Sequence, residues 1–235
     1  MTTPPVADAA EVSFPSSPPL SIDDASTVDK GAFEINLTAG VAGGLAAWES
    51  ETPLVDVNYG LTDDIHLNAE VPLVEAGGRG TTPTVRLGAP ALAMKVRVLN
   101  HDRASLAFHP AVEFPAGVAP IATLPVVLDL AVGRSGTGLG VELAHEFTSP
   151  LSADGWIAAI GFAHPVGGGD LMLDYAQSAD LKVRLGEGWF EAGFARGRLF
   201  GSDSLTLLSS AGISTAVNVS ALLGVQVSPP NGRHR

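Results

Sequence analysis

Apolar and polar residues alternate along much of this chain with the period of a β-strand. The stretch from Val55 to Pro72 reads VDVNYGLTDDIHLNAEVP. In it, two runs of alternating apolar and polar residues flank GLTDD, a sequence typical of a turn. Successive side chains of a strand point to opposite faces, so each run has one apolar face and one polar face. Two such runs joined by a short turn predict an antiparallel hairpin.

The same strand–turn rhythm continues to about residue 227. The run from Phe33 to Val41 alternates over nine residues, and a tilted strand needs about 9–11 to cross a bilayer. No stretch shows a helical period of useful length. We expect turns or loops around Trp48–Ser50 and 76–83. Further strands are predicted at 85–99, 104–114, 126–132, 139–147, 156–164, 171–177, 179–186, 189–198 and 209–219, the last extending at most to 227.

These strands predict an all-β fold: a single antiparallel up-and-down transmembrane β-barrel of about 10–12 strands, of outer-membrane type. Residues 1–30 are rich in Pro, Ser, Thr and Asp and have little periodicity, so we expect an N-terminal tail. Residues 31–227 would form the barrel, and 228–235 a C-terminal tail.

Composition restricts the classes of protein. The 235 residues are 46% hydrophobic and only 16% charged, which is unusual for a soluble protein. No run approaches the roughly 18 apolar residues of a membrane helix, so only strands could span a bilayer. The net charge of −12 argues against a nucleic-acid partner, because such a protein needs Lys and Arg to replace phosphate counterions. The chain has no cysteine, which excludes disulfides and thiolate metal sites.

Several stretches in fixed order resemble one family. They are PPLSIDDASTVDKGAFEINL, VNYGLTDDIHLNAEVPL, LGAPALAMKVRVLN followed by ASLAFHPAVEFPAG, and GEGWFEAGFARG. Together they resemble the bacterial outer-membrane β-barrel transporter family associated with meta-pathway phenol degradation. The matching features include the Lys30-Gly31 pair at the first strand and the hairpin turn from Tyr59 to Asp63. The resemblance covers roughly residues 18–217.

The resemblance implies location in the bacterial outer membrane and passage of small solutes, including aromatic or hydrophobic ones; it carries over no catalytic residues. The N-terminus has neither a basic nor an apolar signal-peptide region, so we expect that a signal was removed. The chain ends in SPPNGRHR rather than in the terminal aromatic residue usual in these barrels, and its Trp and Tyr residues predict only sparse aromatic belts. Lipid and a small-molecule solute are the expected partners, and the sequence does not specify an oligomeric state.

The candidate functional residues are polar side chains on the face that a membrane barrel turns inward. A Lys or Arg facing lipid at mid-bilayer costs about 2–4 kcal/mol, so these residues should line the lumen. They are Glu34, Asn36, Asp56, Asn58, His66, Asn68, Glu70, Lys95, Arg97, Glu142, Glu146, Lys182 and Arg184. We expect the acidic members near Glu34–Glu70 to pair across the lumen with the basic ones. Such pairs either set the selectivity of an open lumen or fill a narrow one.

Catalytic and metal chemistry are not supported by the sequence. The six histidines are scattered without the close spacing of a zinc site. Nothing in the spacing of Ser135 and His109 supports a nucleophilic triad, and the glycines at 133, 136 and 138 lack the Lys-Ser/Thr of a phosphate loop. We therefore expect no enzyme, no metal and no cofactor. His145 is unusual because the alternation along its strand places it on the apolar face. We therefore expect its side chain at the edge of the membrane.

The sequence leaves three functions open. The first is an outer-membrane barrel that passes or binds small solutes, including hydrophobic or aromatic ones, through a polar lumen. The second is a soluble lipocalin-like β-barrel that buries its apolar face and binds an apolar ligand. The third is an outer-membrane barrel without a transport role. The face occupied by the charged residues distinguishes the second from the other two.

Overall fold

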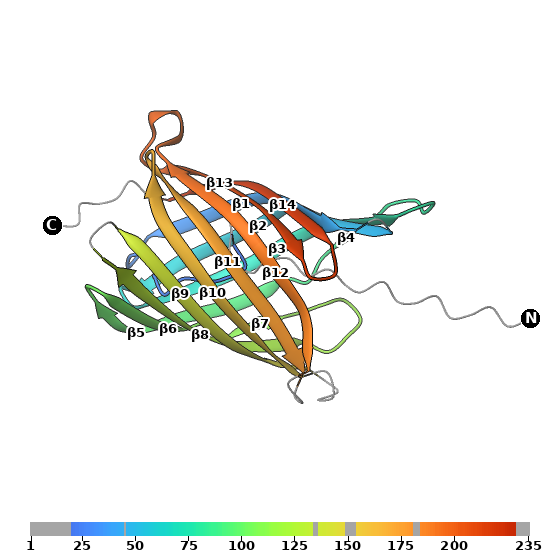
Figure 1. The fold of residues 1–235 in the computed structure, drawn as a ribbon, viewed down its shortest axis with the longest axis horizontal. Coiled ribbons are helices and arrows are strands. Elements are labelled where there is room, and N and C mark those ends of the chain that lie inside the picture. The colour runs from blue at the N-terminus through green and yellow to red at the C-terminus, as the bar shows by residue number, and fades with distance from the viewer. Residues whose placement is uncertain (1–19, 45, 134–135, 149–153, 181–183, 229–235) are drawn as a thin grey trace, which may run out of the picture.

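A computed structural model describes residues 20–44, 46–133, 136–148, 154–180 and 184–228. Its strands form one sheet in which neighbouring strands run antiparallel (Figure 1). The strands are β1 (Phe33–Gly43), β2 (Ala47–Thr62), β3 (Ile65–Gly78), β4 (Thr84–Leu87), β5 (Ala91–His101), β6 (Ala104–Phe108), β7 (Ala111–Glu113), β8 (Ile121–Val132), β9 (Thr137–Phe147), β10 (Gly155–Val166), β11 (Gly169–Asp180), β12 (Leu185–Gly197), β13 (Leu205–Ser214) and β14 (Val219–Val227).

The sheet closes on itself because β1 pairs with β14, in a register that joins Ile35 to Val227 and Gly43 to Val219. Strands β6 and β7 both lie between β5 and β8 and share one position in the wall, and β4 only extends the pairing of β3. The barrel therefore has twelve strand positions. Closure leaves no free sheet edge in the wall, which a β-structure in lipid requires because no water satisfies its backbone groups there.

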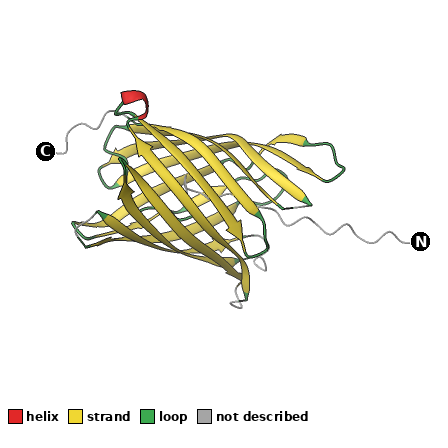
Figure 2. Ribbon diagram, turned by 45° about the horizontal axis from the view of Figure 1, so that its top comes forward, coloured by secondary structure: helices red, strands yellow, loops and turns green. Residues whose placement is uncertain are grey.

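The two ends of the barrel differ (Figure 2). At one end, called here the short-turn end, residues 63–64, 102–103 and 167–168 connect consecutive strands, and β14 finishes there. At the opposite end, called the long-loop end, longer connections include residues 114–120. A 3₁₀ turn, η2 (Leu199–Gly201), also lies at the short-turn end. None of the described residues forms a helix that is long and apolar enough to cross a membrane.

Apolar side chains cover the outside of the barrel and polar ones face inward. Leu37, Leu92 and Leu223 on the outside are 47%, 58% and 59% exposed. Asp56 and Lys95, which point inward, are each only 4% exposed. A soluble lipocalin-like barrel would require the opposite arrangement. The structure thus overturns that alternative and places the charges as a transmembrane barrel must.

Aromatic rings gather near both ends of the outer surface. Phe33 and Tyr59 lie 4.6 Å apart between ring centroids near the short-turn end. Near the long-loop end, His145 packs edge-on against Trp156 at 4.4 Å and beside Phe147. The imidazole of His145 therefore lies in an aromatic cluster at the edge of the apolar surface, where an amphipathic ring is expected at a membrane interface.

Four predicted boundaries are wrong. The expected strand 85–99 is divided into β4 and β5, with residues 88–90 between them. The expected turn around Trp48–Ser50 lies within β2, because pairing with β1 and β3 continues past the apolar region. The expected strand 179–186 is wrong, because residues 179–180 end β11 and residues 185–186 begin β12; residues 181–183 lie outside the described part of the chain. The expected strand 209–219 is the β13–β14 hairpin, whose turn has Val217 at a φ of 63°. The hydroxyl of Ser214 accepts hydrogen bonds from the backbone of that turn, which lacks the usual Gly or Pro.

Candidate functional site: an occluded polar lumen

The residues that precede β1 enter the barrel. Leu20–Val28, called here the internal segment, crosses the lumen from the wall formed by β8–β12 to the wall formed by β3 and β5 (Figure 1). Leu20, Asp23 and Ala25 are buried at 5%, 7% and 0% exposure. The sequence predicted a tail here, and residues 20–28 of that tail occupy the interior.

Four carboxylates on β8, β9, β11 and β12, called here the carboxylate ladder, accept hydrogen bonds from the start of the internal segment. Glu191 accepts from the Ser21 hydroxyl at 2.8 Å. The backbone N–H groups of the next residues donate to the other three carboxylates. These bonds are Ile22 N to Asp174 at 3.0 Å, Asp23 N to Glu142 at 2.9 Å and Ala25 N to Asp129 at 2.7 Å.

Glycines make room for the segment against this wall. A Cβ at Gly161 would lie 2.8 Å from Cγ2 of Ile22, and one at Gly140 would lie 3.1 Å from its Cδ1. Both glycines face the lumen on neighbouring strands, because Gly161 of β10 pairs with Gly140 of β9. The side chain of Ile22 therefore lies over a strip of wall that has no side chains, and the chain approaches the wall closely.

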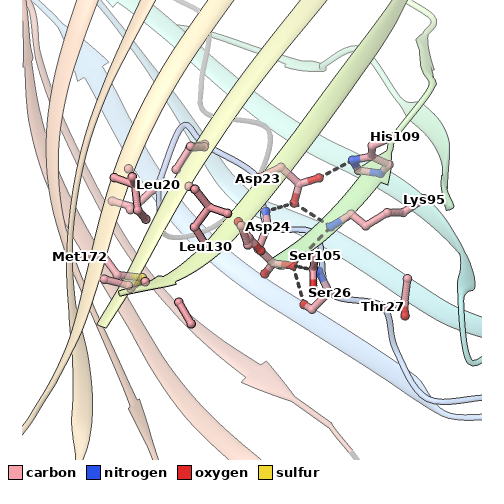
Figure 3. A pocket seen from close by; sticks show the side chains of 18 of the residues that line it. Leu20, Asp23, Asp24, Ser26, Thr27, Lys95, Ser105, His109, Leu130 and Met172 are labelled. Carbon is pink, nitrogen blue, oxygen red and sulfur yellow. Dashed lines mark hydrogen bonds and ion pairs between the residues drawn. The ribbon is translucent and has the colours of Figure 1, made fainter. Parts of the chain in front are cut away.

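On the opposite wall, an ion pair holds the segment. The Lys95 amine of β5 lies 2.8 Å from Oδ1 of Asp23, and His109 Nδ1 lies 2.6 Å from its Oδ2 (Figure 3). A buried carboxylate is costly without a positive charge beside it, and the Lys95 amine supplies that charge to Asp23.

The segment leaves the lumen at the short-turn end. The backbone N–H of Val28 donates to Nδ1 of His66 at 3.2 Å, and the Thr27 hydroxyl donates to the carbonyl of Asp63 at 2.7 Å. Gly31 and Gly60 then pair through their backbones at 2.7 Å, immediately before β1 begins. The internal segment is thus anchored to the barrel at both of its ends.

A second polar group lies on the wall formed by β1–β3 and is called here the amide network. The Asp56 carboxylate accepts hydrogen bonds from the side-chain amides of Asn36, Asn58 and Asn68. Asn68 also donates to Oδ1 of Asn58 at 3.0 Å. All four residues are buried, so this wall satisfies most of its own polar atoms by bonds between neighbouring strands.

The structure brings most of the predicted lumen residues together. Asn36, Asp56, Asn58 and Asn68 form the amide network, and Glu34 and Glu70 lie on the same face of the same strands. His66, Lys95 and Glu142 contact the internal segment. Glu146 is half-buried near the long-loop end.

The basic residues do not pair with the acidic ones in the predicted way. Lys95 binds Asp23 of the internal segment. Arg97 binds Asp64 at the β2–β3 turn, at 3.0 Å. Arg184 lies in the β11–β12 connection, with its side chain 77% exposed, and binds Asp180. Lys182 lies outside the described residues.

Four important residues were not among the candidates. Asp129, Asp174 and Glu191 belong to the carboxylate ladder, and Asp23 is the partner of Lys95. The alternation of inward and outward side chains along each strand would have selected the three wall residues, because each has apolar neighbours on both sides in the sequence. For Asp23 the only signal was a pair of acidic residues within a stretch that otherwise had the composition of a tail.

A cavity remains beside the internal segment, on the side of the short-turn end. Its volume is about 670 Å³, and the turn residues His101–Arg103 form part of its wall. Asp24, Ser26 and Ser105 lie on one side of the cavity, and Leu20, Leu130 and Met172 lie on the other (Figure 3). The segment therefore narrows the lumen and leaves a chamber with one polar and one apolar side.

Fold and interior together define a closed transmembrane β-barrel of outer-membrane type with a segment of its own chain inside a polar lumen. No protein-family model and no curated protein matches the chain. Among solved structures, an outer membrane channel from Pseudomonas putida F1 is similar at a TM-score of 0.71 and 12% identity, covering 88% of this chain and 100% of that one.

Two further solved structures have the same architecture. The NanC porin is similar at a TM-score of 0.58 and 8% identity, over 82% of this chain and 98% of that one. The translocator domain of the autotransporter NalP from Neisseria meningitidis is similar at a TM-score of 0.59 and 12% identity, over 83% of this chain and 88% of that one. At these identities the likeness concerns the fold, which is that of bacterial outer-membrane barrels.

Proposed function

We propose that this chain is a channel of the bacterial outer membrane through which small solutes diffuse, and that it is not an enzyme. The observation that carries the proposal is the cavity of about 670 Å³ inside a polar lumen that an apolar outer surface encloses. Ligand sites in proteins have volumes of about 300–1,000 Å³, so the cavity has room for a small organic molecule. The similar structures named as a channel and a porin support the same function.

The internal segment determines how wide the path is. It is held in the lumen by hydrogen bonds, by the Lys95–Asp23 ion pair and by the contact of Ile22 with the glycine strip. Each of these contacts can break without unfolding the wall, because none of them belongs to the strand pairing. We infer that small solutes pass beside the segment and that larger ones require its displacement.

The solute class is a finer part of the proposal. The resemblance to transporters associated with meta-pathway phenol degradation favours aromatic or hydrophobic solutes. The apolar side of the cavity, with Leu20, Leu130 and Met172, fits a ring or a short alkyl group. Its polar side would hold a hydroxyl or a charged group of the same molecule.

Reconstitution of the full chain into liposomes tests the proposal. We expect liposomes that contain the folded barrel to swell in an isotonic solution of a small neutral sugar, and planar bilayers to show discrete conductance steps. Liposomes with heat-denatured protein serve as the control. If neither the native barrel nor a variant with a displaced segment increases permeability above that control, the chain is a barrel without a transport role.

A further inference from the structure

We propose that the cavity binds a small amphipathic organic cation, an amine or amidine that carries an aromatic or alkyl group. This inference rests on the proposed channel function for its physiological meaning, because the cavity lies on the path of the solute. The binding itself is a separate property that can be measured without transport.

The charge of the cavity wall favours a cation. Seven of the residues that line it carry a carboxylate, and only Lys95 and Arg103 carry a permanent positive charge. The amine of Lys95 is already matched, because it lies 2.8 Å from Asp23 and 3.6 Å from Asp24. The carboxylates that Lys95 does not match therefore favour a cation over an anion, because a cation beside them stabilises their ionised form in a wall of low dielectric constant.

In the described part of the chain, the cavity wall contains both a buried acceptor without a donor, Oδ1 of Asn36, and a buried donor without an acceptor, Nε2 of His66, whose Nδ1 accepts from Val28. Asn36 lines the cavity and is only 5% exposed, and its Oδ1 has no hydrogen-bond partner among the described residues. The amide nitrogen of the same side chain already donates to Asp56. A buried acceptor without a donor is unfavourable, so a ligand N–H group that reaches Asn36 gains a hydrogen bond there.

The internal segment shows that this lumen binds N–H donors. Its backbone N–H groups at Ile22, Asp23 and Ala25 donate to three carboxylates of the ladder. Asp129, one of those three carboxylates, also lines the cavity. An ammonium group presents the same donors with a full positive charge, and hydrogen bonds between charged groups are about twice as strong as neutral ones.

The opposite side of the cavity selects the rest of the ligand. Leu20, Leu130 and Met172 present carbon and sulfur atoms with no charge (Figure 3). An inorganic cation would leave that side unused, and no group of three His, Cys, Asp or Glu residues in the described part of the chain is arranged to hold a metal ion. An organic cation with an apolar body satisfies both sides at once.

Titration calorimetry of the full chain in a neutral detergent tests the inference. The probes are 2-phenylethylammonium, the neutral isostere 2-phenylethanol and the anion phenylacetate. We expect the ammonium to bind at least about tenfold more tightly than the alcohol, the factor that one charge-assisted hydrogen bond provides, and phenylacetate to give no binding heat. Equal affinity for ammonium and alcohol, tighter binding of phenylacetate, or no heat with any probe would overturn the proposal.

Two variants locate the binding. Glu34→Gln removes a carboxylate of the cavity wall and should weaken the binding of 2-phenylethylammonium about tenfold. Asp170→Asn removes an equal charge at the exposed start of β11, outside the cavity, and should leave the affinity unchanged. If Glu34→Gln does not give a folded, heat-modifiable barrel, Asp24→Asn replaces it, because the Asp24 side chain is 65% exposed within the cavity. An equal loss of affinity for 2-phenylethylammonium in the cavity variant and in the control would also overturn the proposal.

Failure of this inference is distinguishable from failure of the proposed function. A barrel that conducts but binds the three probes alike is a channel without the cation site. A barrel that binds the ammonium selectively but does not increase liposome permeability has the site and is not a channel.

Discussion

The two polar walls of the lumen satisfy their buried groups in different ways. In the amide network, donors and acceptor lie on paired strands, since Asn36 pairs with Asp56 and Asn58 pairs with Asn68 in the sheet register. In the carboxylate ladder, only Glu191 has such a partner among the described wall residues, the Ser220 hydroxyl of β14. Asp129 pairs with Gly140, and Asp174 pairs with Glu191, which is a second carboxylate.

The difference explains why the internal segment lies where it does. Like charges directly opposite each other on paired strands are destabilising, and glycine neighbours supply no donor. The hydroxyl of Ser21 and the N–H of Ile22 provide donors to Glu191 and Asp174. The first wall therefore satisfies most of its buried polar groups by itself, whereas the second depends on donors from the internal segment.

The largest effect should come from the ion pair that connects the segment to the amide-network side. Lys95→Met leaves Asp23 buried without its cation, which should lower the free energy of unfolding by about 3–5 kcal/mol or release the segment. Urea titration in detergent and single-channel conductance distinguish these outcomes. The double variant Asp23→Asn/Lys95→Met should recover most of the loss. A loss below about 1 kcal/mol with unchanged conductance contradicts the role of the pair.

Filling the glycine strip should displace the segment without removing a charge. In Gly161→Val the new side chain occupies the place of Ile22, at a cost of up to about 3 kcal/mol to the docked segment. We expect larger conductance from a barrel that remains folded. Gly197→Val is the matched control, because the nearest atom to its Cβ is 4.0 Å away, on Thr206, and Gly197 does not line the cavity. Equal conductance of both variants would mean that Ile22 does not hold the segment.

Damage to the amide network should affect stability and spare the segment. Asn68→Ala removes one of three amide donors to Asp56, and two remain, so we expect a loss of about 1–2 kcal/mol on unfolding. The conductance should match that of the unchanged chain. Asn100→Ala, at the exposed end of β5, is the control. A change in conductance with Asn68→Ala would show that the two walls are coupled.

The smallest effect should come from the ion pair between Arg184 and Asp180, which belongs to neither wall. Its arginine side chain is 77% exposed, and exposed pairs contribute about 0–1 kcal/mol. Arg184→Ala should change neither the unfolding midpoint nor the conductance measurably. A conductance change would show that this connection reaches into the path of the solute, as the sequence first suggested.

Sequence reasoning predicted the fold well and the site in part. Alternation with period two identified the inward faces of β1, β2, β3 and β5, and hence the amide network and Lys95, because register in consecutive hairpins follows from local sequence. It missed the β13–β14 turn, since Ser214 replaces the usual turn residues there. It also paired the basic residues incorrectly, because pairs across a lumen depend on which strands face each other.

The sequence by itself determined the class of structure: an all-β chain with strands long enough to span a bilayer and charges confined to one face. That information is local, since each strand carries its own alternation. Only the tertiary structure decided that residues 20–28 lie in the lumen. Their partners are distant in sequence, with Ser21 and Glu191 separated by 170 positions, and no periodicity in an irregular segment records such contacts. The same closure of the barrel that brings those partners together creates the cavity.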